Sequence, residues 1–347
     1  MPKFPNFIPD LQFARFNDRK IINWFPGHMA KATKQIKEKL KYIDFVIEVR
    51  DARVPISSKN KTINEIFIHK KRLILFNKCD LISKEHQEQI KKYFSSESSS
   101  ATIEGPKVLG TLFTSAKQGL NVNKIVQECL HNKNIEVAPK KFKTIPYTFL
   151  IAGVPNVGKS SIINKLIEKK KAKEGALPGV TRGMGFFPMK TRENCLLLDT
   201  PGIFQPDIET NEQGFKLSLI NALPDHLFGG DSAAGGNATD LTPLIDYMLF
   251  QLNRNECYDY VEILGLKGPT KNIDDLLLAA CKKWKMFTSG GEPDLNKALS
   301  HLLFWFRTGK LGQVVLDCEL LEQSRLNSEI VVDSLKMGKN SSLEPSS

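Results

Sequence analysis

Short apolar runs alternate with longer polar stretches over the first two hundred residues. The runs have the length of strands, at 44–49, 72–76, 109–114, 148–154, 184–189 and 194–199. Because they are almost continuously apolar, they suit strands that helices cover on both faces, as in a parallel α/β sheet. Polar-apolar periodicity predicts helices at 30–41, 84–94 and 160–171, and residues 95–106 read as a polar loop.

The pattern changes after Pro206 to helical periodicity, in segments 211–223, 241–253, 272–287 and 294–309, around a Gly-rich loop at 229–240. The last helix is expected to begin after an Asp294 cap and to end at Gly309. We therefore expect an α/β domain with a mostly parallel sheet, followed by a smaller all-α C-terminal domain. The expected division is an N-terminal segment 1–33, an α/β domain 34–207, a helical domain 208–334 and a disordered tail 335–347.

Composition narrows the class of protein. The 347 residues are 41% hydrophobic and 25% charged, which is typical of globular chains. No apolar run approaches the ~18 residues that a membrane helix needs, so a spanning protein is excluded while surface attachment is not. The six cysteines lack zinc-site spacing and are expected to be free thiols of a reducing compartment.

Charge divides unevenly along the chain. Residues 1–206 hold 36 Lys and Arg against 18 Asp and Glu, whereas residues 207–347 hold 13 against 20. The net charges are thus +18 and −7. A folded unit as basic as the first attracts polyanions, that is, nucleic acid or an anionic membrane.

A phosphate-binding loop follows the apolar run 148–152. Gly153-Val-Pro-Asn-Val-Gly-Lys-Ser160 fits GxxxxGK[ST] and precedes a predicted helix. Backbone N–H groups of such a loop surround phosphates, Lys159 neutralises the outer phosphates, and Ser160 ligates Mg²⁺. Downstream, Asp199 ends a strand and opens the sequence DTPG, so its carboxylate is expected to lie behind the direct ligands of Mg²⁺. The N–H of Gly202 in the same sequence can donate to a γ-phosphate. Between them, Thr181 in a loop can give its hydroxyl to Mg²⁺ when the γ-phosphate is present.

Two base-recognition motifs lie upstream of this loop. The run 72–76 ends in Asn77-Lys78-Cys79-Asp80, and the Asp80 carboxylate can accept hydrogen bonds from guanine N1–H and N2–H₂, which adenine does not offer. Thr114-Ser115-Ala116-Lys117 follows another strand and can give a backbone N–H to guanine O6. Each motif is weak alone, and together with the phosphate loop they indicate a GTP site.

The order of these motifs is inverted, because most GTPases place the phosphate loop first. A cut at a different surface loop can leave the sheet unchanged. The arrangement resembles the circularly permuted GTPases, and Trp24-Phe-Pro-Gly-His-Met29 followed by Asp51-Ala-Arg53 resembles the ribosome-biogenesis branch of that family. The resemblance covers roughly residues 22–312, and in the segments 209–227 and 246–266 the chain is more similar to the mitochondrial members than to the bacterial ones.

The resemblance implies a GTPase that hydrolyses GTP to GDP and phosphate and matures the large ribosomal subunit. It implies a monomer that binds rRNA and ribosomal proteins of the mitochondrial large subunit in the matrix, with peripheral contact to the inner membrane left open. The expected cofactors are GTP or GDP and Mg²⁺, with K⁺ as a further candidate. The candidate metal-site residues are Ser160, Thr181 and Asp199. The candidate nucleotide-binding residues are Asn77, Lys78, Asp80, Ser115, Ala116, Asn156, Val157, Gly158, Lys159, Ser160, Ser161 and Gly202.

Catalysis has two candidate residues. Many GTPases orient the attacking water with a Gln after the DxxG glycine, but this position is Ile203. Asn156 matches the asparagine with which potassium-dependent relatives hold K⁺, and otherwise it shapes the loop. His28 matches the histidine proposed as catalytic in the family, and otherwise it is a surface or capping group. Asp51 and Arg53 are expected to stabilise the base-side loops without a chemical role.

Two other classes stay open. A P-loop kinase would explain the phosphate loop but not the two base motifs. An rRNA or membrane scaffold with weak nucleotide binding would explain why position 203 is Ile and not the water-orienting Gln.

Overall fold

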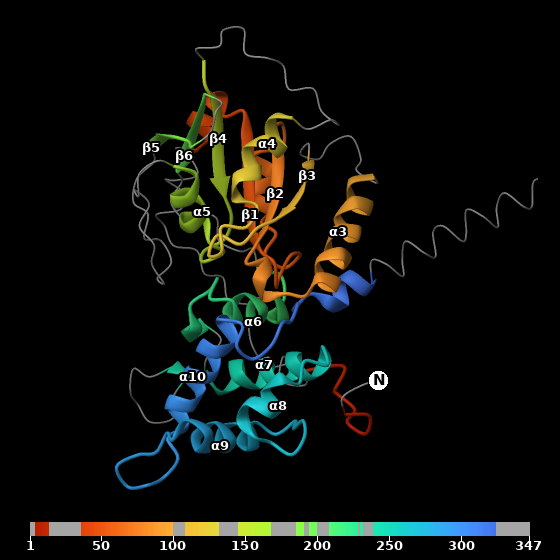
Figure 1. Ribbon diagram of the computed structural model, residues 1–347, viewed down its shortest axis with the longest axis vertical. Coiled ribbons are helices and arrows are strands. Elements are labelled where there is room, and N and C mark those ends of the chain that lie inside the picture. Colours follow the sequence, from red (N-terminus) through yellow and green to blue (C-terminus); the bar gives the residue numbers. More distant parts are fainter. Residues whose placement is uncertain are drawn as a thin grey trace, which may run out of the picture.

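The chain folds into a sheet part and a helical part that lie end to end (Figure 1). The structure is a computed structural model, and it describes residues 4–13, 36–99, 108–131, 145–167, 185–190, 194–199, 208–227, 230–231 and 239–323. We use "sheet part" for the described residues between 36 and 199. "Helical part" denotes those between 208 and 311.

The sheet part is built on a six-stranded sheet in the order β3-β2-β1-β4-β6-β5. All neighbouring strands are parallel except β5, which runs antiparallel to β6. The mostly parallel sheet expected from the apolar runs is confirmed, with each strand within two residues of its predicted run. The strands are β1 (Phe45–Asp51), β2 (Lys71–Asn77), β3 (Val108–Phe113), β4 (Tyr147–Ala152), β5 (Gly185–Pro188) and β6 (Cys195–Asp199).

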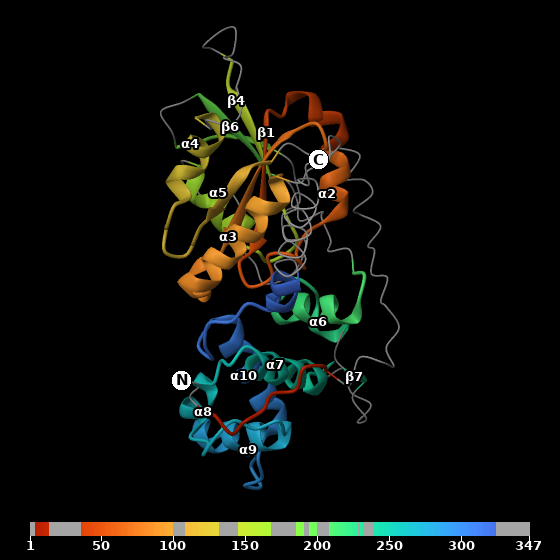
Figure 2. The same ribbon diagram turned by 90° about the vertical axis from the view of Figure 1, so that its right-hand side faces the viewer.

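Helices cover both faces of this sheet, which explains the continuous apolar runs. Helices α4 (Ile125–Leu130) and α5 (Lys159–Leu166) lie on one face and α2 (Lys61–Ile66) on the other (Figure 2). Helix α3 (Lys84–Ser99) shares the face of α2, because Phe94 packs on Phe76 at a ring distance of 5.0 Å. Ile47 packs in the buried cluster that contains residues of α4 and α5, whereas its neighbour Val46 packs in the cluster that contains Ile63 of α2. Side chains of a strand alternate between its two faces in this way.

Two boundaries differ from the sequence expectation. Helix α3 continues to Ser99 and so includes residues 95–99, for which the sequence predicts a polar loop. Helix α5 stops at Leu166, before the predicted end at residue 171. Ile167 turns to extended backbone and forms a β-bridge with Met189, so pairing with a distant segment overrides the local helical pattern.

The helical part contains the four predicted helices and a fifth. Asp294 caps α10 as expected, because its carboxylate accepts a hydrogen bond from Lys297 N at 3.0 Å. Helix α8 was not predicted, since it is short and Tyr258 provides no side-chain cap. The helices are α6 (Asn211–Leu219), α7 (Thr242–Arg254), α8 (Asp259–Leu264), α9 (Ile273–Trp284) and α10 (Leu295–Arg307).

The N-terminal residues pack on the helical part, and the segment after α10 packs on the sheet part. Phe4 and Phe7 pack edge-on against Tyr258 of the helical part, with ring distances of 5.5 and 5.9 Å. After α10 the chain returns to the sheet part, where Val315 and Leu321 join the buried cluster of β2 and α3. The division at residue 207 is therefore not a division between independent cores.

Smaller elements complete the described chain. They are the 3-10 turns η2 (Leu40–Tyr42), η3 (Cys79–Leu81), η4 (Val122–Lys124) and η5 (Asp225–Leu227), and the strand pair β7 (Gly230–Asp231) and β8 (Thr239–Asp240). The first half of the predicted helix 30–41, residues 30–35, lies outside the described residues, as does the predicted disordered tail. All six cysteines are free thiols, as expected. No helix among the described residues is long and apolar enough to cross a membrane.

Candidate functional site

The carboxyl ends of β1, β2 and β4 point toward α6, so their following loops meet between the two parts (Figure 1). Ligands of parallel sheets bind at this edge. A cavity of about 700 Å³ opens there. Among the predicted nucleotide-binding residues, its lining includes Asn77, Lys78, Asp80, Ser115, Ala116, Gly158 and Ser161.

Asn77 connects three loops at the base end of the cavity. Its Nδ2 donates to Val157 O in the phosphate loop at 2.8 Å, and its Oδ1 accepts from Ala116 N at 3.0 Å. Thr114 Oγ1 donates weakly to the same Oδ1 at 3.4 Å. One buried amide thereby holds the two base motifs and the phosphate loop in register.

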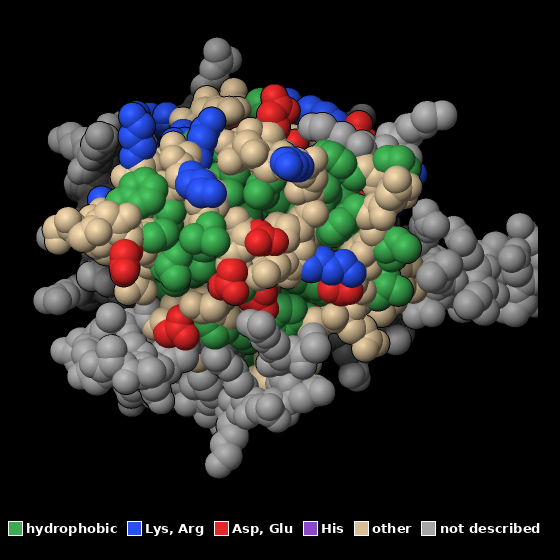
Figure 3. Space-filling view, turned by 90° about the horizontal axis from the view of Figure 1, so that it is seen from below, with side chains coloured by type: hydrophobic (Ala, Val, Ile, Leu, Met, Phe, Trp, Pro, Cys, Tyr) green, Lys and Arg blue, Asp and Glu red, His purple; other side chains and the backbone are tan. Residues whose placement is uncertain are grey.

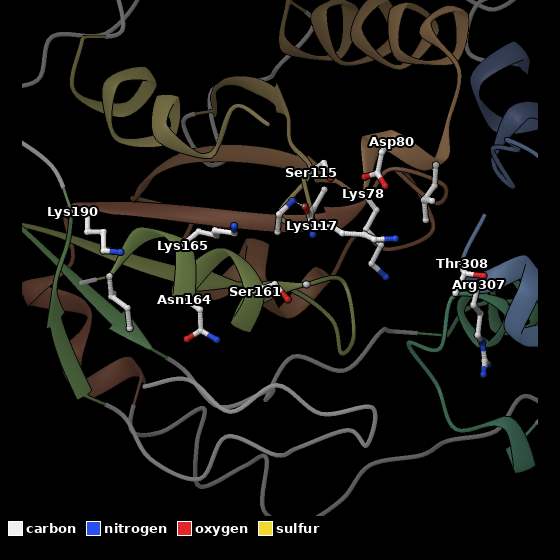
Figure 4. Close-up of a pocket in the computed structure, with 15 residues that line it drawn as sticks. Lys78, Asp80, Ser115, Lys117, Ser161, Asn164, Lys165, Lys190, Arg307 and Thr308 are labelled. Carbon is white, nitrogen blue, oxygen red and sulfur yellow. Dashed lines mark hydrogen bonds between the residues drawn. The ribbon is translucent and has the colours of Figure 1, made fainter. Parts of the chain in front are cut away.

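Asp80 is the residue predicted to recognise the base. Its Oδ1 is buried and has no hydrogen-bond partner among the described residues. A buried carboxylate oxygen without a donor costs free energy unless a ligand supplies one. The adjacent N1–H and N2–H₂ of guanine are such donors, so the site fits a guanine base. Figure 4 shows Asp80, Lys78 and Ser115 near one another, between Ser161 and the Arg307–Thr308 pair.

The phosphate loop has the close backbone packing that its glycines predict. A Cβ on Gly158 would lie 2.2 Å from Asn77 Nδ2, and one on Gly153 would lie 2.2 Å from Val49 O. Both glycines have positive φ angles, of 98° and 148°. A side chain at either position would clash, so the loop can adopt this conformation only with glycine at both.

Two predicted phosphate-end side chains are engaged with the protein itself. Lys159 Nζ donates to Val154 O within the loop at 2.7 Å. Asn156, which is left-handed at φ 58°, donates from Nδ2 to Asn221 O of the helical part at 2.7 Å. These bonds fix where the two side chains lie; an ammonium has three donors and an amide has an oxygen besides its NH₂ group, so neither bond by itself uses the whole polar group.

Lys78 links the base and phosphate ends. Its Nζ donates to Asn156 O at 2.8 Å and pairs with Asp51 Oδ2 at 2.9 Å. Burial lowers the pKa of Lys78, and the Asp51 carboxylate acts against this. Burial would also raise the pKa of Asp51, but Arg53 and Lys78 outweigh it and hold this pKa well below its usual range. The expected support of the base-side loops by Asp51 and Arg53 is thus visible as a buried ion cluster.

The metal end is described in part. Ser160 is the second residue of α5 and half-buried, and β6 ends at Asp199, whose side chain is not described. Thr181, Gly202 and His28 lie outside the described residues. Hydroxyl and carboxylate oxygens are the donors that Mg²⁺ prefers, so this set fits the ion chemically.

Sequence reasoning missed the residues that distant segments bring to the cavity. Lys190 comes from the segment after β5, and Arg307 and Thr308 come from the end of α10 (Figure 4). Gln313 also donates to Asp80 O at 3.2 Å. No local motif marks these positions. Lys117 also lines the cavity, and the sequence does mark it, because it belongs to the TSAK motif.

This combination defines a P-loop GTPase whose base motifs precede its phosphate loop. The family model described as "50S ribosome-binding GTPase" matches residues 148–228. Among curated proteins, mitochondrial GTPase 1 of Aedes aegypti is 37% identical over 86% of this chain and 95% of its own length. Mitochondrial ribosome-associated GTPase 1 of Mus musculus is 34% identical over 87% and 91%.

Bacterial proteins match nearly as well. Ribosome biogenesis GTPase A of Bacillus cereus is 34% identical over 86% of this chain and 94% of its own. The structure of GNP-bound YlqF from T. maritima superposes with a TM-score of 0.53 at 23% identity, over 82% of this chain and 97% of that one, and so supports the fold. The chain belongs to the family of circularly permuted GTPases that contains these mitochondrial and bacterial proteins.

Proposed function

We propose that the protein is a GTP-hydrolysing assembly factor that binds the mitochondrial large ribosomal subunit and promotes its maturation, and thereby mitochondrial translation. The observation that carries the nucleotide part is the buried, unpartnered Asp80 Oδ1 in a cavity that also borders a phosphate loop. The ribosomal part is supported by the printed names of relatives that this chain matches over most of its length. Those names also support a mitochondrial location, which we refine to the matrix, with peripheral contact to the inner membrane as an extension.

Charge supports contact with rRNA on the sheet part. Residues 1–206 carry a net charge of +18, and Lys37 and Lys41 beside β1 are exposed. Each lysine that neutralises a phosphate releases counterions and strengthens binding at low salt. We propose that this surface supplies the electrostatic part of docking by a monomer.

The helical part offers different surfaces, although residues 207–347 carry a negative net charge. Hydrophobic side chains gather among charged ones on the face seen in Figure 3. An aromatic surface lies beside the C-terminal end of α10, where Trp305 lies 4.8 Å from Trp284 in ring distance, Phe304 is 54% exposed, and Lys310 Nζ lies 5.1 Å from the Trp305 ring. Unpaired RNA bases stack on exposed aromatic rings. We propose that this surface contributes selectivity for the subunit.

Hydrolysis needs groups other than a Gln, because Ile203 follows the DxxG glycine. We propose that the amide oxygen of Asn156 holds K⁺ near the developing negative charge, while its Nδ2 anchors the side chain on Asn221 O. We propose that His28 acts on the attacking water when the subunit is bound. Mg²⁺, held by Ser160 and Thr181 with Asp199 behind them, would neutralise the phosphate oxygens.

Turnover by the purified full chain tests this function. We expect GTP, and not ATP, to be hydrolysed at ~10⁻⁴–10⁻² s⁻¹ unaided, and faster with mitochondrial large subunits. Small subunits serve as the control. A preference for ATP would indicate a kinase, and absence of turnover with every addition would indicate a scaffold. His28→Ala should remove most of the stimulated rate, by ~10²–10⁴-fold for a lost acid–base group, at unchanged GTP affinity.

A further inference from the structure

A buried pair, Asp51 and Arg53, lies between Lys78 of the nucleotide cavity and the end of α10. Arg53 donates from Nε to Asp51 Oδ1 at 3.0 Å and from Nη2 to Asp51 Oδ2 at 2.9 Å. The same strand holds a second buried pair, in which Arg50 Nε donates to Glu48 Oε1 at 2.7 Å. Glu48 and Arg50 point to the opposite face of β1 from Asp51, so the two pairs share chemistry and differ in surroundings.

On the nucleotide side, Asp51 holds Lys78. The lysine ammonium pairs with Asp51 Oδ2 at 2.9 Å and donates to Asn156 O at 2.8 Å, so it spans the base motif and the phosphate loop. Asp51 is fully buried, and its carboxylate is shared by two cations. A shift of Lys78 therefore changes the charge balance that Arg53 experiences.

On the helical side, Arg53 holds the end of α10 and the returning chain. Its Nη1 donates to Arg307 O at 3.3 Å, and its carbonyl oxygen accepts from Leu316 N at 2.7 Å. The Arg307 guanidinium in turn donates to Ser218 O at 2.7 Å, at the end of α6. The single arginine thus contacts the segment that fixes α10 against the sheet part.

We propose that Asp51 and Arg53 are positioning residues that couple guanine-nucleotide binding to the placement of the helical part. The ordering of Lys78 by a nucleotide fixes Asp51, which fixes Arg53 and the chain that Arg53 holds. Coupling of this kind is reciprocal, so docking of the helical part also changes nucleotide affinity. The coupling rests on nucleotide binding in the cavity and is independent of the ribosomal partner.

Hydrogen exchange of the full chain, with and without GDP and Mg²⁺, tests the coupling. Residues 314–317 are the readout, because they do not line the cavity and Leu316 N is bound to Arg53. We expect GDP to slow exchange there in the wild type. Arg53→Gln should abolish this response and weaken GDP binding about fivefold or more, the lower end of typical couplings. Exchange at 218–221 should keep part of its response, since Asn156 contacts Asn221 directly.

Arg50→Gln is the matched control, since it removes a buried arginine from an equivalent pair on the other face. It should lower the unfolding midpoint like Arg53→Gln and leave the GDP response at 314–317 intact. The coupling is refuted if Arg53→Gln keeps that response, or if the folded wild type binds GDP without showing it. Should Arg53→Gln not fold, Arg53→Lys decides, because lysine keeps the charge and loses the two-oxygen contact; a full response there also refutes it. A wild type that binds no guanine nucleotide would instead contradict the proposed GTPase function.

Discussion

The base end and the phosphate end of the nucleotide site are built in different ways. At the base end, Asn77 already bonds Val157 O and Ala116 N, and the buried Asp80 Oδ1 lacks a donor among the described residues. At the phosphate end, Lys159 and Asn156 already donate to protein carbonyl oxygens, at 2.7 Å each. The base end therefore presents an oxygen that is ready for a ligand, whereas two side chains of the phosphate end are anchored on protein carbonyl oxygens.

This difference separates recognition from response. A guanine base can bind Asp80 without displacing a protein contact, so base selectivity costs no rearrangement. At the phosphate end, Lys159 is anchored to Val154 O and Asn156 to Asn221 O, and Asn221 belongs to the helical part. Binding at the phosphate end is therefore linked to a contact between the two parts, whereas binding at the base end is not linked through Asn156.

The largest expected effect is on the base end. Asp80→Asn should reduce the preference for GTP over xanthosine triphosphate by up to ~10⁴-fold, because a site built around hydrogen bonds rejects a mismatched partner by this factor. Competition with fluorescent GDP measures it, with the exposed Glu88→Gln as control. Because the base contact needs no phosphate, guanosine binding should weaken in parallel. Unchanged affinity for both ligands would remove Asp80 from the site.

Lys159→Ala should affect the phosphate end alone. GTP affinity should fall by about 100-fold, since a hydrogen bond to a charged group contributes roughly 1.5–3 kcal/mol. Guanosine affinity should stay at the wild-type value, which is the opposite of the Asp80→Asn result. Ser160→Ala is the companion variant, and it should weaken the Mg²⁺-dependent part of GTP binding. Equilibrium titration with and without Mg²⁺ measures both, and wild-type GTP affinity in Lys159→Ala would refute the phosphate-loop assignment.

The strands and the base end could be predicted from sequence for the same reason. Continuous apolar runs such as 72–76 are recognisable without knowing their neighbours, and several of them lead directly into a motif, as 72–76 leads into Asn77-Lys78-Cys79-Asp80. Where the local pattern was informative, as at the Asp294 cap, the element formed as predicted. Helix α5 ended early because Ile167 pairs with Met189, a contact that no local pattern contains.

The engaged state of the phosphate end could not be predicted. The bond from Asn156 to Asn221 joins residues 65 positions apart, and the bond from Arg53 to Arg307 joins residues 254 apart. The sequence marks Asn156 as a loop residue and leaves Asn221 and Arg307 unmarked. Such pairs depend on how the helical part packs on the sheet part, which motif spacing does not encode.

The smallest expected effect concerns K⁺ and Asn156. Asn156 Nδ2 donates to Asn221 O, so K⁺ would be held by the other polar atom of this side chain, the amide oxygen, and a single oxygen contributes a modest part of the barrier. We expect subunit-stimulated turnover to be roughly tenfold faster in K⁺ than in Na⁺ at equal ionic strength, or ~1.4 kcal/mol of barrier. Asn156→Ala should bring the two rates together while guanosine affinity, set at the base end, stays unchanged. Equal wild-type rates in K⁺ and Na⁺ would leave Asn156 with a purely structural role, as the residue that ties the phosphate loop to the helical part.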